Sequence, residues 1–249
     1  AAGFAEPGAW NAVARALASV PGGADWVLSG VARLDHLGAA MLLMPDRRGP
    51  DPGRRRAELV RRLAQEAGYK NEITVHIVEG GPVNAFTLPG GTLVFYSDLI
   101  DQAKDSSQVA GVLAHEIGHV VHYHPTKGLV RAFGMDLLAK LLSGGYSDIL
   151  ATVGSGGNLL WALRNGRAFE READATGVGL LEKRGLRADG VASFFEQMME
   201  KQPKDAAASA GIWSSHPATA ERIAATKRPP TGKPAFTAAE WKALREVCK

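Results

Sequence analysis

The segment His115-Glu116-Ile117-Gly118-His119 constrains the fold of this chain of 249 residues more than any other feature. On an α-helix, residues four apart lie one turn from each other on the same face, so two imidazoles can converge on one zinc ion. Glu116 is then placed to reach a water molecule on that ion. The segment therefore predicts a helix whose histidine-bearing face points into a metal site.

A third protein ligand is needed, because a catalytic zinc site takes three side chains and leaves the fourth place for water. His122 shares the azimuth of His115, but the two lie roughly 10 Å apart along a straight helix, too far for one ion. The extended form of the motif is also absent, since Pro125 stands where it has a third histidine. We therefore interpret His122 and His124 as helix-end residues or as partners of a ligand.

Carboxylates further along the chain are the remaining candidates for the third ligand. Glu170 and Asp174 are four apart and share one helix face, whereas Glu172 must point elsewhere. We expect Glu170 to be the ligand and Asp174 to accept the Nδ1 hydrogen of His115, which would fix the tautomer of that imidazole. Glu172 is expected to pair with a nearby arginine such as Arg171 or Arg164. The alternative is that all three acids are solvated helix surface.

The composition is that of an ordinary globular chain, with 45% hydrophobic and 22% charged residues. It excludes collagen-like, disulfide-scaffold and wholly disordered classes, and Cys248 has no partner for an intrachain disulfide. The net charge is only +3, so the chain lacks the positive field of a dedicated nucleic-acid binder, and we expect no nucleic-acid partner. The stretch Trp26 to Met44 contains Arg33, Asp35 and His36, so we do not expect it to span a membrane.

The chain divides into an N-terminal extension with a linker, residues 1–53, and a main domain, residues 54–249. Within the extension, residues 1–44 are expected to form two helices. Residues 129–163 alternate apolar helical pieces with glycine-rich breaks. They are interpreted either as a mobile lid or as ordinary helix–loop–helix packing.

A small sheet is predicted just before the motif helix. Residues 73–78 alternate as a strand, and residues 83–88 and 92–96 flank the turn Pro89-Gly90-Gly91, which predicts a hairpin. We expect residues 92–96 to form the sheet edge beside the cleft, where an extended polypeptide can add as a further strand, unless that edge is covered. The residues assigned to substrate binding are Asn84, Ala85, Phe86, Thr92, Leu93 and Val94.

Helices are predicted over most of the remaining chain, from their start and stop signals. Asp105 or Ser106 caps the motif helix, Gly185 ends a helix that starts at about Leu159, and Asp189, Pro217 and Thr237 begin the later ones. The predicted fold is therefore α+β and mainly helical, with a small mixed sheet packed beside the helix that carries the two histidines.

The combined motifs resemble the gluzincin metallopeptidases. Three segments narrow the resemblance, namely Asn84-Ala85-Phe86, Leu88-Pro89-Gly90-Gly91 and Val112-Leu113-Ala114-His115-Glu116. They are similar to the family that includes the CAAX prenyl endopeptidase, the mitochondrial protease Oma and bacterial periplasmic quality-control peptidases. Ser215-His216-Pro217 and Glu221-Arg222-Ile223 also match, the likeness covers Glu58 to Lys227, and Tyr123-His124 replaces the usual Arg-His pair.

The resemblance implies a gluzincin-like fold with one zinc ion per chain, held by His115, His119 and Glu170, and with Glu116 as general base. It implies an endopeptidase acting on unfolded or misfolded proteins in a bacterial periplasm or cell envelope. Polypeptide substrates are the implied partners, together with a membrane surface or envelope proteins. The alternative is a latent metal-bound chaperone or binding module with blocked turnover.

Two further residues are brought to the site by the same resemblance. His216 is either a donor to the oxyanion or a removable fourth zinc ligand, with a packing histidine as the alternative. Arg222 either orients a carboxylate of the site or lies on the surface.

Overall fold

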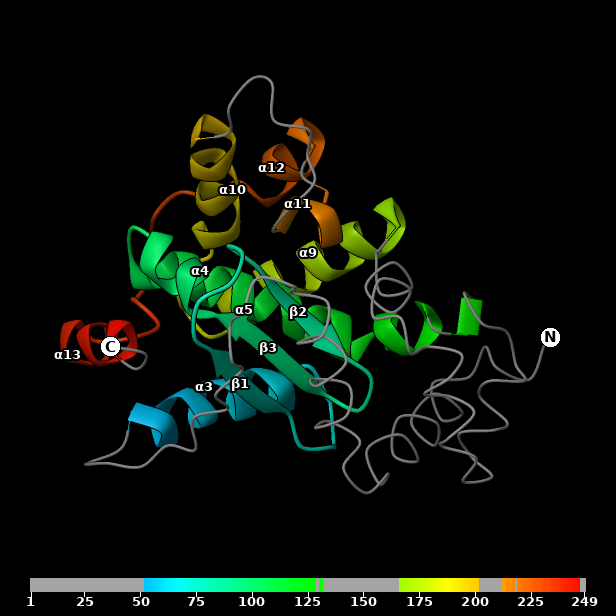
Figure 1. The fold of residues 1–249 in the computed structure, drawn as a ribbon, viewed down its shortest axis with the longest axis horizontal. Helices are drawn as coiled ribbons and strands as arrows, with labels where there is room; N and C mark the ends of the chain where they lie inside the picture. The colour runs from blue at the N-terminus through cyan, green and yellow to red at the C-terminus, as the bar shows by residue number, and fades with distance from the viewer. Residues whose placement is uncertain (1–51, 129, 132–165, 202–211, 218, 247–249) are drawn as a thin grey trace.

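The computed structural model describes residues 52–128, 130–131, 166–201, 212–217 and 219–246, which Figure 1 draws in colour. The helices predicted within residues 1–44 and most of the glycine-broken stretch 129–163 lie outside these residues. The division into an N-terminal extension and a main domain therefore stays a prediction. So does the choice between a lid and ordinary packing for residues 129–163.

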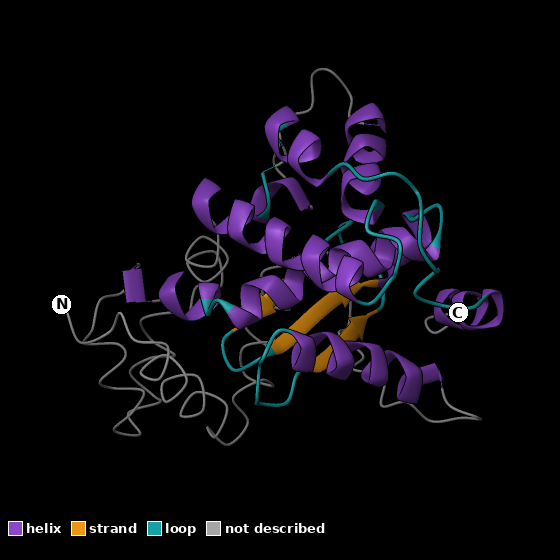
Figure 2. Ribbon diagram, turned by 180° about the vertical axis from the view of Figure 1, so that it is seen from behind, coloured by secondary structure: helices purple, strands orange, loops and turns teal. Residues whose placement is uncertain are grey.

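Helices dominate the described residues and accompany one small sheet, which confirms the predicted α+β, mainly helical fold (Figures 1 and 2). In chain order the elements are α3 (Pro52–Glu66), β1 (Thr74–Val78), β2 (Ala85–Leu88), β3 (Thr92–Tyr96), α4 (Ser97–Gln102), α5 (Ser106–Val121), α9 (Arg167–Lys183), α10 (Gly190–Lys201), α11 (Ile212–Ser215), α12 (Ala220–Thr226) and α13 (Ala238–Arg245). From bottom to top, both views show α3, the sheet, α5 with α9, and α10 with α12. The motif helix α5 thus lies in the middle.

The sheet has the strand order β1-β3-β2. β1 pairs with β3 in parallel, with Thr74 opposite Thr92, and β2 pairs with β3 antiparallel. The predicted mixed sheet and its hairpin are therefore confirmed. The turn between β2 and β3 places Gly90 and Gly91 at φ values of 90° and 89°, a left-handed conformation that residues with a Cβ disfavour.

β3 is not an edge strand, so the prediction that residues 92–96 form the edge beside the cleft is wrong. β1 occupies one edge of β3 and β2 the other. The main-chain groups of Thr92, Leu93 and Val94 serve these two neighbours and cannot pair with a further strand. The hairpin signal could not reveal this arrangement, because a parallel pair such as β1 and β3 is joined by a crossover rather than by a turn. β2 is one of the two edge strands, and it is the one that contacts α5.

α5 is buried along almost its whole length. At its start the Asp105 carboxylate accepts hydrogen bonds from the main-chain N–H groups of Ser107 and Gln108, at 2.8 and 3.1 Å. Asp105 rather than Ser106 is therefore the cap. Every residue from Ser106 to Val120 is buried, and the helix contacts α3, α9, α10 and β2. A helix without a solvent face belongs to the core.

The ends of the other helices agree only partly with their predicted signals. Gly185 follows the end of α9 at φ 63°, and Thr237 caps α13, both as predicted. α12 begins at Ala220 after the cap residue Thr219, so the start predicted at Pro217 is too early. α10 begins at Gly190, directly after Asp189 as predicted, and the Asp189 side chain accepts hydrogen bonds from the guanidinium group of the nearby Arg187.

The backbones of α5 and α9 touch at two glycines. A Cβ on Gly118 of α5 would lie 2.7 Å from the Ala173 carbonyl oxygen. A Cβ on Gly177 of α9 would lie 2.8 Å from the main-chain carbon of Ala114 and from the nitrogen of His115. Neither position can take a side chain unless the helices move apart. This contact sets how closely the histidines of α5 approach the carboxylates of α9.

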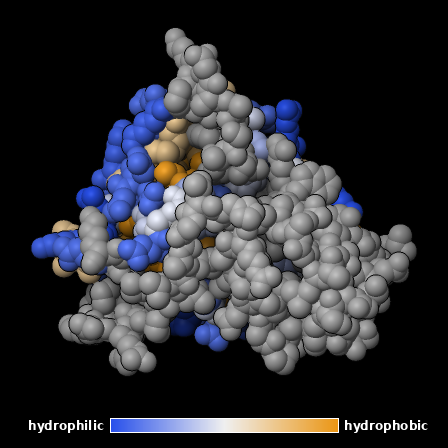
Figure 3. Space-filling view, in the orientation of Figure 1, coloured by the Kyte–Doolittle hydropathy of each residue, from blue (hydrophilic) through white to orange (hydrophobic). Residues whose placement is uncertain are grey.

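The described part of the surface shown in Figure 3 is mostly polar. Figure 3 shows mainly hydrophilic residues on the coloured part of this face, with hydrophobic residues over α10, the helix that carries the exposed Met199. None of the described helices is long and apolar enough to cross a membrane.

Replacing Gly177 with alanine should destabilise the protein by about 1–3 kcal/mol, because the added methyl group overpacks the contact with α5. The matched control is Gly179→Ala on the same helix, where a Cβ meets nothing within 4 Å. That change should stabilise the protein by roughly 0.5–1 kcal/mol, because alanine loses less backbone entropy in a helix. Urea unfolding curves measure both, and equal midpoints for the two variants would contradict the contact.

Candidate metal centre

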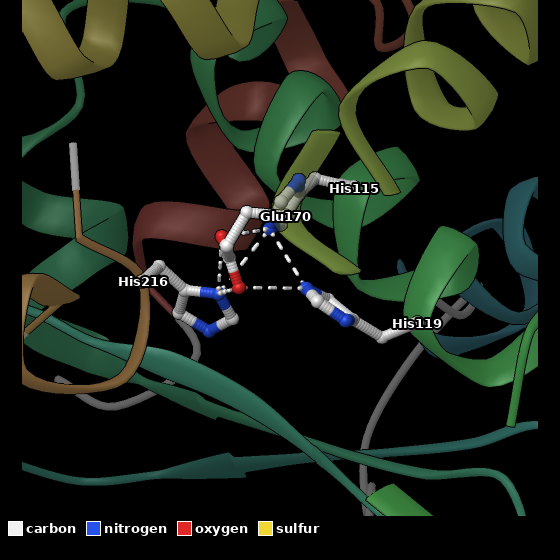
Figure 4. Close-up of side chains that lie close together, drawn as sticks. All are labelled: His115, His119, Glu170 and His216. Carbon is white, nitrogen blue, oxygen red and sulfur yellow. Dashed lines mark hydrogen bonds and ion pairs between the residues drawn. The ribbon is translucent and has the colours of Figure 1, made fainter. Parts of the chain in front are cut away.

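Four buried side chains converge between α5, α9 and the segment after α11. They are His115, His119, Glu170 and His216, and one potential ligand atom from each lies within 4.8 Å of the others (Figure 4). The Nε2 atoms of His115 and His119 are 3.0 Å apart. Glu170 Oε2 lies 3.5 Å from His115 Nε2, and Glu170 Oε1 lies 3.4 Å from His119 Nε2. The structure therefore brings the three predicted ligands together and adds His216 as a fourth side chain.

The donor set fits a zinc ion on chemical grounds. Zinc in proteins binds imidazole nitrogen and carboxylate oxygen, and two histidines with one glutamate form a known catalytic set. The nitrogens of His115 and His119 cannot face each other at 3.0 Å with two N–H groups or two bare lone pairs, so a proton or a cation must lie between them. These residues can hold a metal ion.

The far side of His115 faces Asp174. The two groups approach to 2.9 Å between Nδ1 and Oδ1, although this approach is an ion-pair contact rather than a well-aligned hydrogen bond. Burial alone would lower the pKa of His115, but the close contacts and negative charges of Asp174 and Glu170 outweigh it and raise this pKa to about 10. An environment that holds a proton so strongly also stabilises other cations.

Arg222 joins the two carboxylates of α9. Its Nε and Nη2 donate hydrogen bonds to Asp174 at 2.6 and 2.8 Å, and its Nη1 lies 2.7 Å from Glu170 Oε2. Burial would raise the pKa of Glu170, yet the electrostatic effect of His216 and the hydrogen bonds of its histidine neighbours hold this pKa well below its usual range. Burial would also raise the pKa of Asp174, and Arg222 and His115 lower it. Arg222 therefore helps to keep Asp174 ionised, and it places its positive charge beside Glu170.

The two carboxylate oxygens of Glu116 differ in their surroundings. Oε2 accepts a hydrogen bond of 2.6 Å from the hydroxyl group of Thr87 on β2. Oε1 is buried and has no hydrogen-bond partner among the described residues, although it lies 3.2 Å from His216 Nε2. One oxygen is thus held by the sheet, and the other is left for a group that enters the site.

His216 has one nitrogen toward the cluster and one toward the sheet. Nδ1 lies 3.2 Å from His115 Nε2 and 3.2 and 3.3 Å from the Glu170 oxygens. Nε2 lies 3.2 Å from the carbonyl oxygen of Ala85, and it can donate a hydrogen bond there. A proton on Nε2 leaves the lone pair of Nδ1 directed at the cluster.

Glu172 pairs with histidines, so the predicted pairing with Arg171 is wrong, and the other predicted partner, Arg164, lies outside the described residues. Its Oε2 lies 2.9 Å from His124 Nε2, and its Oε1 lies 3.2 Å from His122 Nδ1. The reason is that α5 ends at Val121, and its last turn lies against α9. Arg171 is instead 3.8 Å from an exposed glutamate of α12.

His124 is a partner of His119, which is one of the two interpretations left open above. The Nδ1 atoms of the two rings are 2.8 Å apart. Burial, together with the positive charge of His119, His122 and Lys127, lowers the pKa of His124 to about 2. His124 is therefore a neutral imidazole.

Thr87 is the residue in contact with Glu116 that sequence reasoning missed. It lies between the matched segments Asn84-Ala85-Phe86 and Pro89-Gly90-Gly91, where its hydroxyl group carries no signal of its own. Strand alternation puts it on the same face as Ala85, whose carbonyl contacts His216. Only the packing of β2 on α5 shows that this face meets the site.

Comparison with known proteins gives one family and several relatives. The model of peptidase family M48 matches residues 50–229. Metalloprotease LoiP of Escherichia coli (strain K12) is 33% identical over 144 residues, which cover 56% of this chain and 56% of that protein. A putative beta-barrel assembly-enhancing protease of Vibrio cholerae is 27% identical over 175 residues, 66% of this chain and 36% of that protein. Mitochondrial metalloendopeptidase OMA1 of Arabidopsis thaliana is 30% identical over 125 residues, 50% of this chain and 25% of that protein. The chain thus spans little more than half of the first of these relatives and less of the other two.

Replacing Arg222 with methionine should destabilise the protein by about 3–5 kcal/mol, because it leaves two buried carboxylates without their cation. Arg171→Met is the matched control, because this arginine is half exposed and makes only a 3.8 Å contact; it should change stability by less than about 0.5 kcal/mol. Denaturant unfolding at neutral pH measures both. Equal losses in the two variants would show that Arg222 does not stabilise the buried carboxylates.

Proposed function

The chain belongs to peptidase family M48, whose model matches more than half of it, and from this membership we propose that it is a zinc-dependent endopeptidase. The predicted family resemblance is confirmed, and the relatives that match are named as metalloproteases and a metalloendopeptidase. The proposed reaction is hydrolysis of peptide bonds in unfolded or misfolded proteins. The observation that carries it is the buried Oε1 of Glu116, which accepts no hydrogen bond from the described residues and lies beside four convergent potential ligands.

We propose His115, His119 and Glu170 as the residues that hold one zinc ion per chain. When bound, zinc would supply Lewis-acid chemistry, acidifying a water molecule and polarising the peptide carbonyl. Asp174 orients His115, and Arg222 orients Glu170 and Asp174 through its hydrogen bonds and charge. These contacts would hold the His115 and Glu170 side chains in the orientation that the metal site needs.

Glu116 is the proposed general base. Its Oε1 takes a proton from the attacking water as the new carbon–oxygen bond forms. The same oxygen then delivers that proton to the amine nitrogen as the carbon–nitrogen bond breaks, so the carboxylate is regenerated. Thr87 stays bonded to Oε2 throughout, which keeps Oε1 directed at the site.

The geometry of His216 supports the role of a removable fourth ligand over that of an oxyanion donor. Its Nδ1 faces Glu170 and His115, and its Nε2 is engaged by the Ala85 carbonyl. The same geometry supports the second candidate function, a latent metal-bound chaperone or binding module. In that case His216 would complete a closed set of four ligands and block turnover.

The outer edge of β2 is the proposed binding site for an extended polypeptide. The Asn84 carbonyl accepts a hydrogen bond from Tyr96 on β3, so strand alternation turns the main-chain groups of Ala85 to the outer edge. His216 already contacts the Ala85 carbonyl there. Of the six residues assigned to substrate binding, Asn84, Ala85 and Phe86 therefore remain in this proposal.

The cellular role is proposed from the family relatives alone. Two bacterial relatives are named as a metalloprotease and a beta-barrel assembly-enhancing protease, which supports action in the periplasm or cell envelope. We propose polypeptide substrates there, with a membrane surface or envelope proteins as further partners. Residues 54–249 are proposed as the protease domain, which is supported by a family match that begins at residue 50.

Replacing Glu116 with glutamine should lower casein hydrolysis by roughly 10²–10⁴-fold while zinc content is kept, because the amide cannot accept the water's proton. Glu221→Gln, on the exposed side of α12, is the control and should remain active. Activity of the wild type should be lost with 1,10-phenanthroline and return with zinc. A Glu116→Gln variant with wild-type activity would contradict the proposed base, and a zinc-binding wild type that never cleaves casein would favour the binding module.

Replacing Thr87 with valine should lower kcat roughly tenfold with little change in KM, because an isosteric side chain no longer holds Glu116 Oε2. Thr87→Ser restores a hydroxyl donor and should retain most activity. In the Glu116→Gln background, Thr87→Val should cost no further activity. An additive loss in that double variant would show that Thr87 acts on the fold and not on Glu116.

A further inference from the structure

A single proton must lie between the rings of His119 and His124. Their Nδ1 atoms are 2.8 Å apart, and two imidazole nitrogens at this distance need one donor and one acceptor. Both rings are buried, with His119 1% and His124 0% exposed, so water does not compete for this contact. The direction of the hydrogen bond is therefore a property of the site.

The environment of His119 sets that direction. Its Nε2 faces His115 and Glu170, the side where a cation would be held, so its own proton belongs on Nδ1. His119 Nδ1–H then donates to His124 Nδ1, and the proton of His124 must be on Nε2. That nitrogen lies 2.9 Å from Glu172 Oε2, which can only accept when the carboxylate is ionised. All three side chains are satisfied by one arrangement of protons.

We infer that His124 and Glu172 are positioning residues for the metal site, which hold His119 with Nδ1 protonated and Nε2 directed at the cation. This inference rests on the proposed zinc site. It assigns to His119 a support separate from the Asp174 and Arg222 pair behind His115. The metal-binding face of α5 thus has two supports, one for each histidine.

The local structure holds the His124 ring in place. Phe169 stacks on it with ring centroids 4.1 Å apart and planes 7° apart. Tyr123 just before it has φ 54°, a left-handed conformation that is unfavourable for a residue with a Cβ. This turn ends α5, and a new helical turn starts at His124. The chain therefore changes direction at Tyr123, and this turn places the His124 ring against His119.

The two supports differ in exposure. Asp174 and Arg222 are buried, whereas the Glu172 side chain is 47% exposed. Water screens the charge of an exposed carboxylate, so Glu172 should matter less than the imidazole it orients. His124 and Glu172 could also act only on the fold, by connecting the end of α5 to α9, and this structural role can be tested separately. His122 Nε2 makes a 2.7 Å contact with the Thr176 hydroxyl between the same two segments, while its other nitrogen, Nδ1, contacts Glu172.

The test is the zinc affinity of the full chain, measured by competition with a chromophoric chelator. His124→Phe keeps a flat ring that can stack on Phe169 but removes the acceptor, and it should raise the zinc dissociation constant roughly 10–100-fold. His124→Asn places a carbonyl oxygen near the Nδ1 position and should recover most of the affinity. Glu172→Gln keeps an acceptor and should have a smaller effect than His124→Phe. Thr176→Val, the control for tying the helices together, should leave the affinity unchanged.

The outcomes separate this inference from the proposed function. A wild-type protein that binds no zinc would overturn both. A zinc-binding wild type with equal affinity in His124→Phe, or an equal loss in Thr176→Val, would overturn this inference alone.

A second measurement tests the proposed proton positions on His119 and His124 even if His124→Phe does not fold. Long-range ¹⁵N–¹H NMR spectra of the zinc-loaded wild type should show His119 protonated at Nδ1 and His124 protonated at Nε2. A His124 ring that carries its proton on Nδ1 would overturn the inference.

Discussion

The contact between the backbones of α5 and α9 is the constraint on which the site depends. Gly118 rests against Ala173, and Gly177 rests against Ala114 and His115, with no room for a Cβ at either glycine. Helix axes can approach this closely only where side chains are missing at the contact. The approach brings the imidazoles of one helix and the carboxylates of the other within 3.5 Å. Without it, the histidine motif would face ordinary core.

The site is a buried network whose charges are balanced by neighbouring groups. Isolated carboxylates and imidazoles are costly to bury, and they are tolerated here because each has a partner. Arg222 contacts Glu170 and Asp174, and Thr87 donates a hydrogen bond to Glu116. The Nδ1 atom of His115 faces Asp174, and that of His119 faces His124. Glu116 Oε1 lies 3.2 Å from His216 Nε2 but has no hydrogen bond within the described part of the chain. This is consistent with a base that must receive a proton from outside the protein.

Sequence reasoning succeeded where the relevant geometry is local. The fold class, the hairpin turn at Gly90 and Gly91, and the caps Asp105 and Thr237 follow from short segments and agree with the structure. It failed for the sheet edge, because the parallel pairing of β1 with β3 joins strands that are not adjacent in the chain. It also failed for Glu172, since nothing in the local pattern shows that the end of α5 turns back toward α9.

The sequence by itself determined which side chains can share a helix face, because a spacing of four residues puts His115 with His119 and Glu170 with Asp174 wherever the helices go. Only the tertiary structure decided that these two faces meet, and that His216, Arg222, Thr87 and His124 reach them. The physical reason is range. Helical periodicity acts over a few residues, whereas the contacts that complete the site join segments up to 131 residues apart, as between Ala85 and His216.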